Sequence, residues 1–325
     1  MSHGRILVTG GAGYLGSVLV DDLLRGGRPV RALDALIVGD GRSLLHLWGR
    51  PGFEFVRGDV RDADVRASAL ADVEAVVHLA AVVGDPACAR DPDRAREINL
   101  AATGALVSEA AAAGVDRFVF ASTCSNYGKM HDGDAVATEE WELRPVSLYA
   151  ETKVAAEIDV LAHSTAGIAT ICLRFATVYG VSPRMRFDLT VNEFARDAFV
   201  NRELLVYGEQ FWRPYVHVRD AAQAVSTVLE APTDQVQGEV FNVGNSSQNF
   251  RKQDLVELLL ERVPDALVER VAKQEDPRDY RVGFDKIESQ LGYATTRTVP
   301  GGIDELIALL GSGAISDPFA DVFRN

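Results

Sequence analysis

The feature that most constrains the fold is a regular alternation of short apolar runs and amphipathic stretches over the first 175 residues. The runs expected to form strands are Arg5–Thr9, Pro29–Leu33, Phe53–Val56, Ala75–Leu79, Arg117–Ala121 and Ala169–Arg174. Helical patterns lie between them at Tyr14–Arg25, Ala63–Leu70, Asp93–Ala113 and Ser147–His163. Near-continuous apolar strands joined by helices are typical of a parallel sheet covered on both faces, so we expect an α/β fold of the doubly wound type.

The rest of the chain has a looser pattern, which indicates a smaller α/β region. Further strands are expected at Glu203–Val206, Tyr215–Val218 and Glu239–Val243, and helices at Val191–Val200, Arg219–Leu229, Arg251–Arg262, Asp285–Gln290 and Ile303–Leu310. The chain has no low-complexity tract or long linker, so the two regions should pack against each other. We predict that residues 1–180 and 215–244 form the domain with the parallel sheet, and that residues 181–214 and 245–325 form a substrate-binding domain.

Charge and cysteine content exclude several classes of protein. The 33 Lys and Arg residues against 47 Asp and Glu give a net charge of −14, which argues against a protein that coats nucleic acid or an anionic membrane. Cys88, Cys124 and Cys172 lack a disulfide or zinc-binding pattern, so a reducing compartment is expected. We see no signal peptide, no membrane span and no metal-binding motif, and we therefore expect a soluble cytoplasmic protein without a metal.

A glycine-rich turn follows the first predicted strand, in the segment Thr9–Gly16. Glycines at such a strand–helix junction allow backbone amides to approach a pyrophosphate, which then lies at the N-terminus of the helix. Asp34 follows the second strand, where a carboxylate accepts hydrogen bonds from ribose hydroxyls and repels a 2′-phosphate. These features predict a dinucleotide site that prefers NAD to NADP, although the nearby Arg31 leaves the choice open.

Tyr149 and Lys153 are four residues apart in a predicted helix, so they share one helix face. A free phenol has a pKa of about 10, which is too high for a base at neutral pH. A nearby ammonium and the positive nicotinamide ring favour the phenolate and lower that pKa. Tyr149 can then take a proton from a substrate hydroxyl as hydride leaves the carbon, although the same spacing also suits an exposed helix pair.

Further polar side chains lie where the fifth predicted strand ends, in Ala121–Gly128. Hydroxyls at the C-terminal ends of parallel strands face the crevice in which ligands bind. A hydroxyl here can hydrogen-bond the substrate oxygen that Tyr149 deprotonates, whereas Ser and Thr at strand ends also often bind loop amides.

Together these segments resemble the extended short-chain dehydrogenase/reductase family, in the nucleotide-sugar epimerase and dehydratase branch typified by UDP-galactose 4-epimerase. The resemblance covers nearly the whole chain and also includes Leu173–Gly180, Arg213–Asp220, Asn242–Gly244 and Pro277–Lys286. It implies a Rossmann-type fold, NAD as the cofactor and a nucleotide-diphosphate sugar as the substrate.

The resemblance also implies roles for individual residues. Thr123, Tyr149 and Lys153 correspond to the catalytic Ser/Thr, the base and its lysine. The implied cofactor-binding residues are Gly10, Gly13, Tyr14, Leu15, Gly16, Asp34, Asp59, Val60, Leu79, Ala80, Ala81, Asn99, Ser122, Tyr149 and Lys153. The implied substrate-binding residues are Cys124, Ser125, Thr177, Arg184, Arg186, Arg213 and Arg278. Asp59 can accept from adenine or cap the next helix, a role that Asp62 fits better, and Asn99 is as much a structural as a functional candidate.

Two departures from the family pattern bear on the reaction. In the 4,6-dehydratases of this branch an Asp-Glu pair follows the catalytic Thr, whereas this chain has Cys124 and Ser125. A thiol replaces a carboxylic acid poorly at neutral pH, so 4,6-dehydration is disfavoured. Arg184 and Arg186 lie where the substrate loop is expected, and they indicate either more negative charge on the ligand or a solvated surface loop.

We therefore expect an NAD-dependent nucleotide-sugar epimerase that inverts C4 through a transient 4-keto intermediate. The alternatives are a 4-ketoreductase, a dehydratase or a uronic-acid decarboxylase of the same family and, more remotely, a non-catalytic NAD-binding sensor. The resemblance also implies a homodimer, in which the helices at Asp93–Ala113 and Ser147–His163 of two subunits form a four-helix bundle.

Overall fold

The computed structural model describes residues 4–130, 135–272 and 279–325. Within them, a seven-stranded sheet has the order β10-β6-β5-β4-β1-β2-β3, and every neighbouring pair is parallel. Its strands are β1 (Arg5–Thr9), β2 (Val30–Asp34), β3 (Phe53–Arg57), β4 (Val73–His78), β5 (Arg117–Thr123), β6 (Ala169–Phe175) and β10 (Glu239–Val243). The strand order reverses between β1 and β4, and ligands of such sheets bind at this switch point, beyond the carboxyl ends of the strands.

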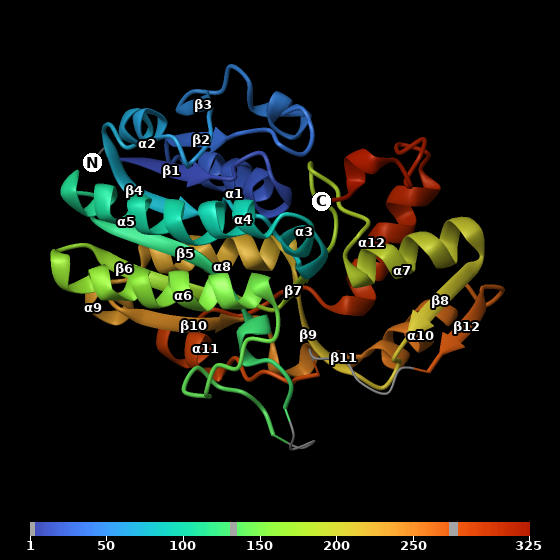
Figure 1. Cartoon of the computed structure of the whole chain (residues 1–325). Coiled ribbons are helices and arrows are strands. Elements are labelled where there is room, and N and C mark those ends of the chain that lie inside the picture. Colours follow the sequence, from blue (N-terminus) through green and yellow to red (C-terminus); the bar gives the residue numbers. More distant parts are fainter. Residues whose placement is uncertain (1–3, 131–134, 273–278) are drawn as a thin grey trace.

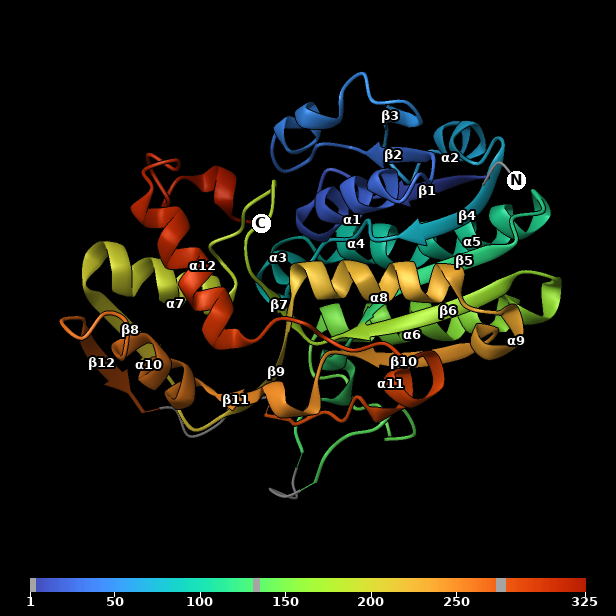
Figure 2. The same ribbon diagram turned by 180° about the vertical axis from the view of Figure 1, so that it is seen from behind.

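Helices cover both faces of this sheet, as Figures 1 and 2 show from opposite sides. Apolar side chains of α1 (Tyr14–Arg25) and α8 (Val218–Glu230) pack on one face. Those of α2 (Ala63–Ala69), α5 (Ala102–Ala112) and α6 (Leu148–Ala162) pack on the other. The remaining helices of this part are η1 (Arg42–Leu47), α3 (Asp85–Arg90), α4 (Pro92–Arg96), η2 (Glu97–Ala101), η3 (Cys124–Tyr127), η4 (His163–Ala166), α9 (Thr233–Val236) and α11 (Asp285–Leu291). The predicted doubly wound α/β fold is confirmed.

The second, smaller part of the molecule has its own hydrophobic core. It lies beside the seven-stranded sheet in both views (Figures 1 and 2). It contains a three-stranded sheet, β11-β9-β7, and a two-stranded sheet, β12-β8. Its elements are β7 (Thr177–Tyr179), α7 (Thr190–Arg196), η5 (Asp197–Asn201), β8 (Glu203–Tyr207), β9 (Trp212–His217), η6 (Ser246–Gln248), β11 (Asn249–Arg251), α10 (Lys252–Leu260), β12 (Leu267–Val271), α12 (Val299–Gly311) and η7 (Asp321–Phe323). The predicted division of the chain into two domains stays a prediction.

The predicted helix at Asp93–Ala113 is interrupted in the structure. Its middle, Glu97–Ala101, is a π-helical turn between α4 and α5. Such bulges inside α-helices are frequent at functional sites, and this one carries Asn99.

No described helix is long and apolar enough to cross a membrane.

Candidate active site

The glycine-rich turn between β1 and α1 packs so closely against neighbouring backbone that a side chain at its glycines would not fit. We call this turn the glycine cradle. Gly10 has a φ of +69°, and a Cβ there would lie 2.9 Å from the backbone nitrogen of Ala80. A Cβ on Gly16 would collide with the carbonyl oxygen of Gly10. The turn therefore brings bare backbone to the N-terminus of α1 at the switch point, where the chain can hold a pyrophosphate.

Asp34 is the last residue of β2, and its side chain hydrogen-bonds the glycine-rich turn. Its carboxylate accepts hydrogen bonds from the amides of Ala12 (3.0 Å) and Leu36 (2.8 Å). Burial raises the pKa of the Asp34 carboxyl, and these hydrogen bonds act in the opposite direction. Arg31 points elsewhere, since its Nη1 donates to the carbonyls of Ala69 and Ala71 at 2.7 Å. Arg31 is thus unavailable to a 2′-phosphate, which supports NAD over NADP.

The carboxyl end of β3 carries Asp59 and the cap of α2. Asp62 accepts from the amide of Asp64 at 2.9 Å, so the predicted helix cap is confirmed. Asp59 forms an ion pair with Arg61 at 2.8 Å, and this guanidinium lowers the pKa of the Asp59 carboxyl. Val60 is buried beside them. The adenine contact of Asp59 stays a prediction, and Arg61 would compete for the same carboxylate.

Asn99 fixes the loop after β4 to the helix that carries Tyr149. Its Oδ1 accepts from the amide of Val82 (2.8 Å), and its Nδ2 donates to the carbonyl of Val82 (3.0 Å) and to Oγ1 of Thr152 (3.3 Å). The preceding residues Leu79 and Ala80 donate their amides to Thr9. The Asn99 carboxamide thus positions the loop Leu79–Val82, and its predicted cofactor contact stays a prediction.

The helix α6 presents Tyr149 and Lys153 beside the end of β5. Ser147 caps the helix by accepting from the amide of Ala150, and its hydroxyl donates to Asp85 at 2.7 Å. Lys153 Nζ donates to the carbonyl of Ala121 at 2.8 Å. This bond ties the active-site helix to the strand that ends at Thr123.

The protonation of Tyr149 and Lys153 is set mainly by burial. Burial raises the pKa of the Tyr149 phenol, while the nearby charge of Arg186 lowers it. Burial lowers the pKa of the Lys153 ammonium to about 8. Thr123, the last residue of β5, is buried, and its Oγ1 accepts from the amide of Ser125 at 3.1 Å. Tyr149 needs the positive charges around it to act as a base near neutral pH.

The buried ammonium of Lys153 should lower the stability of the fold. Its folded pKa of about 8 lies below the ordinary value of 10.5, so the unfolded chain binds more protons between these two pH values. Below pH 8 the charge costs the folded state on the order of 3 kcal/mol, and this cost disappears as the pH rises to 10.5.

Lys153→Met should therefore raise the free energy of unfolding in urea by up to about 3 kcal/mol at pH 7, and by much less at pH 10. The matched control is Lys252→Met, which removes a lysine from the surface at the start of α10. An equal effect of Lys153→Met at both pH values would contradict this explanation.

The hydroxyl of Ser122 belongs to a buried network. It donates to Glu157 at 2.6 Å and accepts from Asn126 at 3.1 Å. Glu157 in turn forms a short ion pair with Arg174, which also donates to the hydroxyl of Tyr127 at 2.9 Å. This network links β5, α6 and β6, and the predicted cofactor contact of Ser122 stays a prediction.

The two positions that follow Thr123 are also placed by the structure. Cys124 is 1% exposed, and its Sγ donates to the carbonyl of Arg174 at 3.1 Å. This side chain packs in the core, and burial raises the pKa of the Cys124 thiol. Its predicted substrate contact stays a prediction. Ser125 shares a hydrogen bond with the hydroxyl of Tyr280 at 3.3 Å. Thr177 is half-buried in β7, and the predicted substrate contacts of Ser125 and Thr177 stay predictions.

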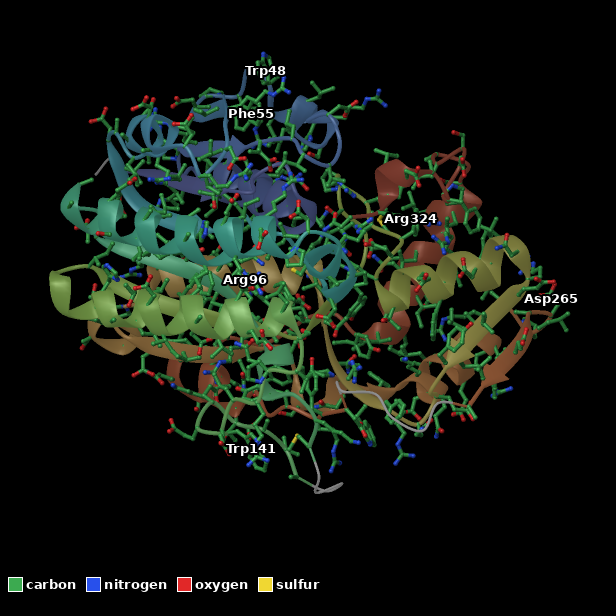
Figure 3. The ribbon with its side chains drawn as sticks, in the orientation of Figure 1. Trp48, Phe55, Arg96, Trp141, Asp265 and Arg324 are labelled. Carbon is green, nitrogen blue, oxygen red and sulfur yellow. The ribbon has the colours of Figure 1, made fainter. Side chains whose placement is uncertain are left out.

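Arg184 and Arg186 lie inside the protein and not on a solvated loop. Arg184 donates to the carbonyls of Met185 and Arg324, and Figure 3 shows Arg324 between the two parts of the molecule. Arg186 makes two hydrogen bonds to Asp188, at 2.7 and 2.9 Å. Both guanidinium groups are thus engaged by the protein, and Asp188 offsets the charge of Arg186.

Arg213, another substrate candidate, lies on β9. Arg213 is buried, donates to the carbonyl of Trp212 at 2.7 Å and lies over the ring of Tyr280. The guanidinium groups of Arg251 and Arg281 both lie over the ring of Trp212. This cluster concentrates positive charge on aromatic faces, as a site for a nucleotide diphosphate requires. Sequence reasoning missed both aromatic rings, although each one adjoins an arginine in the chain.

Two further predictions concern Arg278 and the binding of a metal. Arg278 lies outside the described residues. Among the described residues, no group of three or more His, Cys, Asp or Glu side chains could hold a metal ion.

Residues 6–244 match the NAD dependent epimerase/dehydratase family. This chain belongs to that family. It is 32% identical to dTDP-glucose 4,6-dehydratase of Streptomyces griseus over 94% of this chain and 93% of the relative. It is 28% identical to UDP-glucuronic acid decarboxylase 1 of Arabidopsis thaliana over 94% of this chain and 69% of that protein.

A structural neighbour agrees with this assignment. The UDP-glucose 4-epimerase of Thermus thermophilus, solved in complex with NAD, superposes with a TM-score of 0.83 at 28% identity and covers 96% of this chain and 100% of its own. The family contains NAD-dependent nucleotide-sugar epimerases, dehydratases and decarboxylases, and NAD is its cofactor. The glycine cradle and Asp34 fit NAD, since they offer bare amides for the pyrophosphate and a carboxylate for ribose hydroxyls.

Proposed function

We propose that this protein is an NAD-dependent nucleotide-sugar epimerase that inverts C4 through a transient 4-keto sugar. The observation that carries the proposal is the pair of residues after Thr123. At these positions the core thiol of Cys124 and the hydroxyl of Ser125 stand where the 4,6-dehydratases have an Asp-Glu pair. Elimination of water needs an acid and a base beside C5 and C6, and neither side chain supplies one near neutral pH.

The proposed mechanism uses three side chains. Tyr149, as the phenolate, takes the proton of the C4 hydroxyl, and Thr123 hydrogen-bonds the same oxygen. The ammonium of Lys153 favours the phenolate, because it lies on the same face of α6. NAD supplies the chemistry of accepting hydride from C4 and returning it. Tyr149 then gives its proton back to the C4 oxygen after the sugar has turned, so the net reaction consumes no cofactor.

The arginines do not favour a uronic-acid substrate. A carboxylate on the sugar would need a guanidinium that is free to bind it, whereas Arg184 and Arg186 are held by Arg324 and Asp188. Decarboxylation is therefore an alternative outcome of the experiment below, as are dehydration and reduction of a 4-keto sugar.

Product analysis tests the proposal. The holoenzyme is incubated with UDP-glucose, dTDP-glucose and UDP-glucuronic acid, and the products are identified by mass and by proton NMR while NADH absorbance is followed. We expect an epimer of unchanged mass and no net change in NADH. Loss of water, loss of carbon dioxide or stoichiometric use of NADH would instead identify a dehydratase, a decarboxylase or a ketoreductase. NAD binding with no turnover of any substrate would identify a non-catalytic sensor.

We also propose that the protein is a cytoplasmic homodimer that pairs through α5 and α6. Ala101, the last residue of η2, and Ser108 of α5 are small and exposed, and α6 exposes Ile158 by 65%. Small side chains let helices approach closely, and an exposed isoleucine in mid-helix gains from burial against a second subunit. The three unpaired, buried cysteines suit a reducing compartment.

Ile158→Arg should convert the dimer to a monomer, because two buried cations would face each other across the twofold axis. Sedimentation at micromolar concentration measures the mass. Ile37→Arg is the matched control, since Ile37 is also about half exposed, at 51%, but lies after β2. A monomeric wild type, or a dimeric Ile158→Arg variant, would refute this interface.

A further inference from the structure

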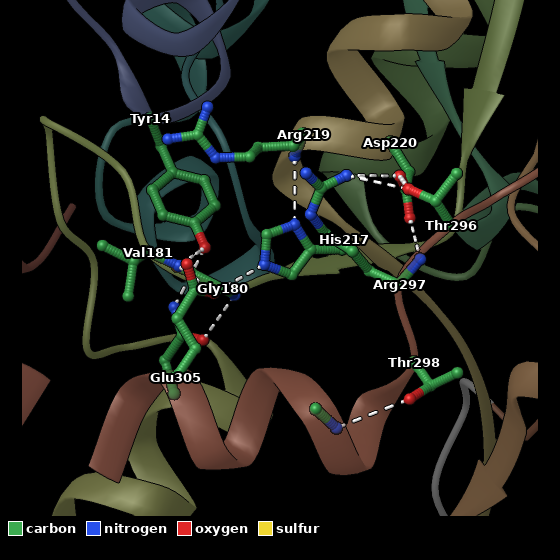
Figure 4. Close-up of polar contacts among 12 residues, drawn as sticks. Tyr14, Gly180, Val181, His217, Arg219, Asp220, Thr296, Arg297, Thr298 and Glu305 are labelled. Atoms are coloured by element: carbon green, nitrogen blue, oxygen red, sulfur yellow. Dashed lines mark hydrogen bonds and ion pairs between the residues drawn. The ribbon is translucent and has the colours of Figure 1, made fainter. Parts of the chain in front are cut away.

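Residues 180–182 follow β7 and form a crossing segment that is hydrogen-bonded to the start of the cofactor helix α1. We call the contacts of Tyr14, Ser182 and Asn192 that join them the clasp. The phenol of Tyr14 donates to the carbonyl of Gly180 at 2.5 Å. The hydroxyl of Ser182 donates to the carbonyl of Tyr14 at 2.7 Å and lies 3.2 Å from the hydroxyl of Ser17. All these side chains are buried, and Figure 4 shows the ring of Tyr14 directed at Gly180. Tyr14, which was predicted to bind the cofactor, thus uses its side chain to bind the smaller part of the molecule.

Asn192 completes the clasp from the side of the smaller part. It lies on α7 and is fully buried. Its Oδ1 accepts from the amide of Gly180 at 2.9 Å, and its Nδ2 donates to the hydroxyl of Tyr14 (3.1 Å) and to the carbonyl of Arg186 (2.8 Å). One carboxamide therefore joins the cofactor helix, the crossing segment and the loop that holds Arg186.

A second set of contacts holds the same segment from within the smaller part. His217, at the end of β9, contacts Glu305 of α12 at 2.8 Å, and the amide of Val181 donates to the same carboxylate oxygen at 3.4 Å (Figure 4). Gly180 has a φ of +105°, and any Cβ there would collide with the ring of His217. The crossing segment is therefore locked between two elements of the smaller part and the first turn of α1.

We propose that Tyr14, Ser182 and Asn192 are positioning residues that couple the binding of NAD to the binding of the nucleoside diphosphate of the substrate. The first turn of α1, which receives the pyrophosphate of NAD, shares buried hydrogen bonds with the loop that carries Arg184 and Arg186. When one ligand orders its segment, it also orders the other segment through these bonds. Each ligand should therefore bind with a lower Kd when the other is already bound. The inference rests on a nucleotide-sugar substrate, but not on which carbon reacts.

Equilibrium dialysis tests the coupling without turnover. The Kd for NAD is measured alone and with saturating UDP, dTDP, GDP, CDP or ADP, and the ratio of the two Kd values is the coupling factor. We expect a factor of about five or more in the wild type with at least one nucleotide. Tyr14→Phe and Ser182→Ala, which each remove a single hydroxyl, should bring the factor close to one.

Tyr293→Phe is the matched control. The hydroxyl of Tyr293 is also buried and donates to a backbone carbonyl, that of Asp220, but it lies outside the clasp. This variant should lose stability as Tyr14→Phe does and keep the wild-type coupling factor.

Three results would overturn the inference: a wild-type factor of one with every nucleotide, an unchanged factor in both clasp variants, or an equal fall in Tyr293→Phe. Because no product is formed in this assay, an error in the proposed reaction would appear only in the product analysis, and the two conclusions fail separately.

Discussion

Tyr149→Phe should lower kcat by about 10²–10⁴-fold with little change in KM, because general base catalysis typically contributes that much. The phenol takes the proton in the transition state, whereas substrate binding uses other groups, so the loss should fall on kcat. The fold should be retained, since the phenylalanine ring fills the same half-buried space on α6. Initial rates with the substrate identified by product analysis, together with the NAD content of the purified variant, measure the effect.

The control for Tyr149→Phe is Tyr207→Phe, which removes the hydroxyl of a tyrosine that is 50% exposed on β8. Tyr207→Phe should keep the wild-type rate. A Tyr149→Phe variant that turns over within about threefold of wild type would remove Tyr149 from the role of base, since the expected loss is at least tenfold larger than that margin.

Glu157→Gln should lower the free energy of unfolding by about 3–5 kcal/mol, which is the usual cost of breaking a buried ion pair on one side. Glu157 and Arg174 are 3% and 5% exposed in their side chains. Glutamine keeps the shape of the side chain but leaves the guanidinium of Arg174 without its counter-charge and weakens the bond to Ser122. Chemical denaturation at pH 7 measures the change.

Two further variants separate charge from shape. Glu151→Gln makes the same substitution on the exposed side of α6 and should change stability by less than about 0.5 kcal/mol. The double variant Glu157→Gln/Arg174→Met should recover part of the loss, since it leaves no buried charge unpaired. A single variant as stable as the wild type would show that the ion pair does not support the helix that carries Tyr149.

The sequence predicted the large sheet well because its strands are apolar runs bounded by glycine or charge. β1 and β10 have the predicted bounds, and so does α1. The missed strand β12 has five residues, but most of them are exposed or charged. Other missed elements are short: β7 and β11 have three residues each, and α3 has six. Runs this short carry too few residues to show a period, and β7 and β11 form only because β9 lies between them.

Within the candidate site, the sequence predicts relations along one helix better than relations between distant segments. The spacing of Tyr149 and Lys153 is a local property of one helix, so the chain itself reveals their common face. The direction of Ser122 depends on Glu157, and that of Arg184 depends on Arg324, 140 residues away. Such long-range partners leave no mark in the local sequence, which is why the protein partners of these two side chains could not be predicted from it.

β10 is an edge strand of the large sheet and the last of its strands to be translated, which has a consequence for the synthesis of this protein in the cell. β10 pairs with β6, but the 68 residues from Ala176 to Val243 must be translated before it can do so. At roughly 5–20 residues per second this takes about 3–14 seconds. During that interval β6, all of whose residues are buried in the folded protein, has an unpaired edge of the kind that recruits strands of other chains. The nascent protein is therefore most exposed to aggregation after its first six strands have been made, and a chaperone would be of most use at that stage.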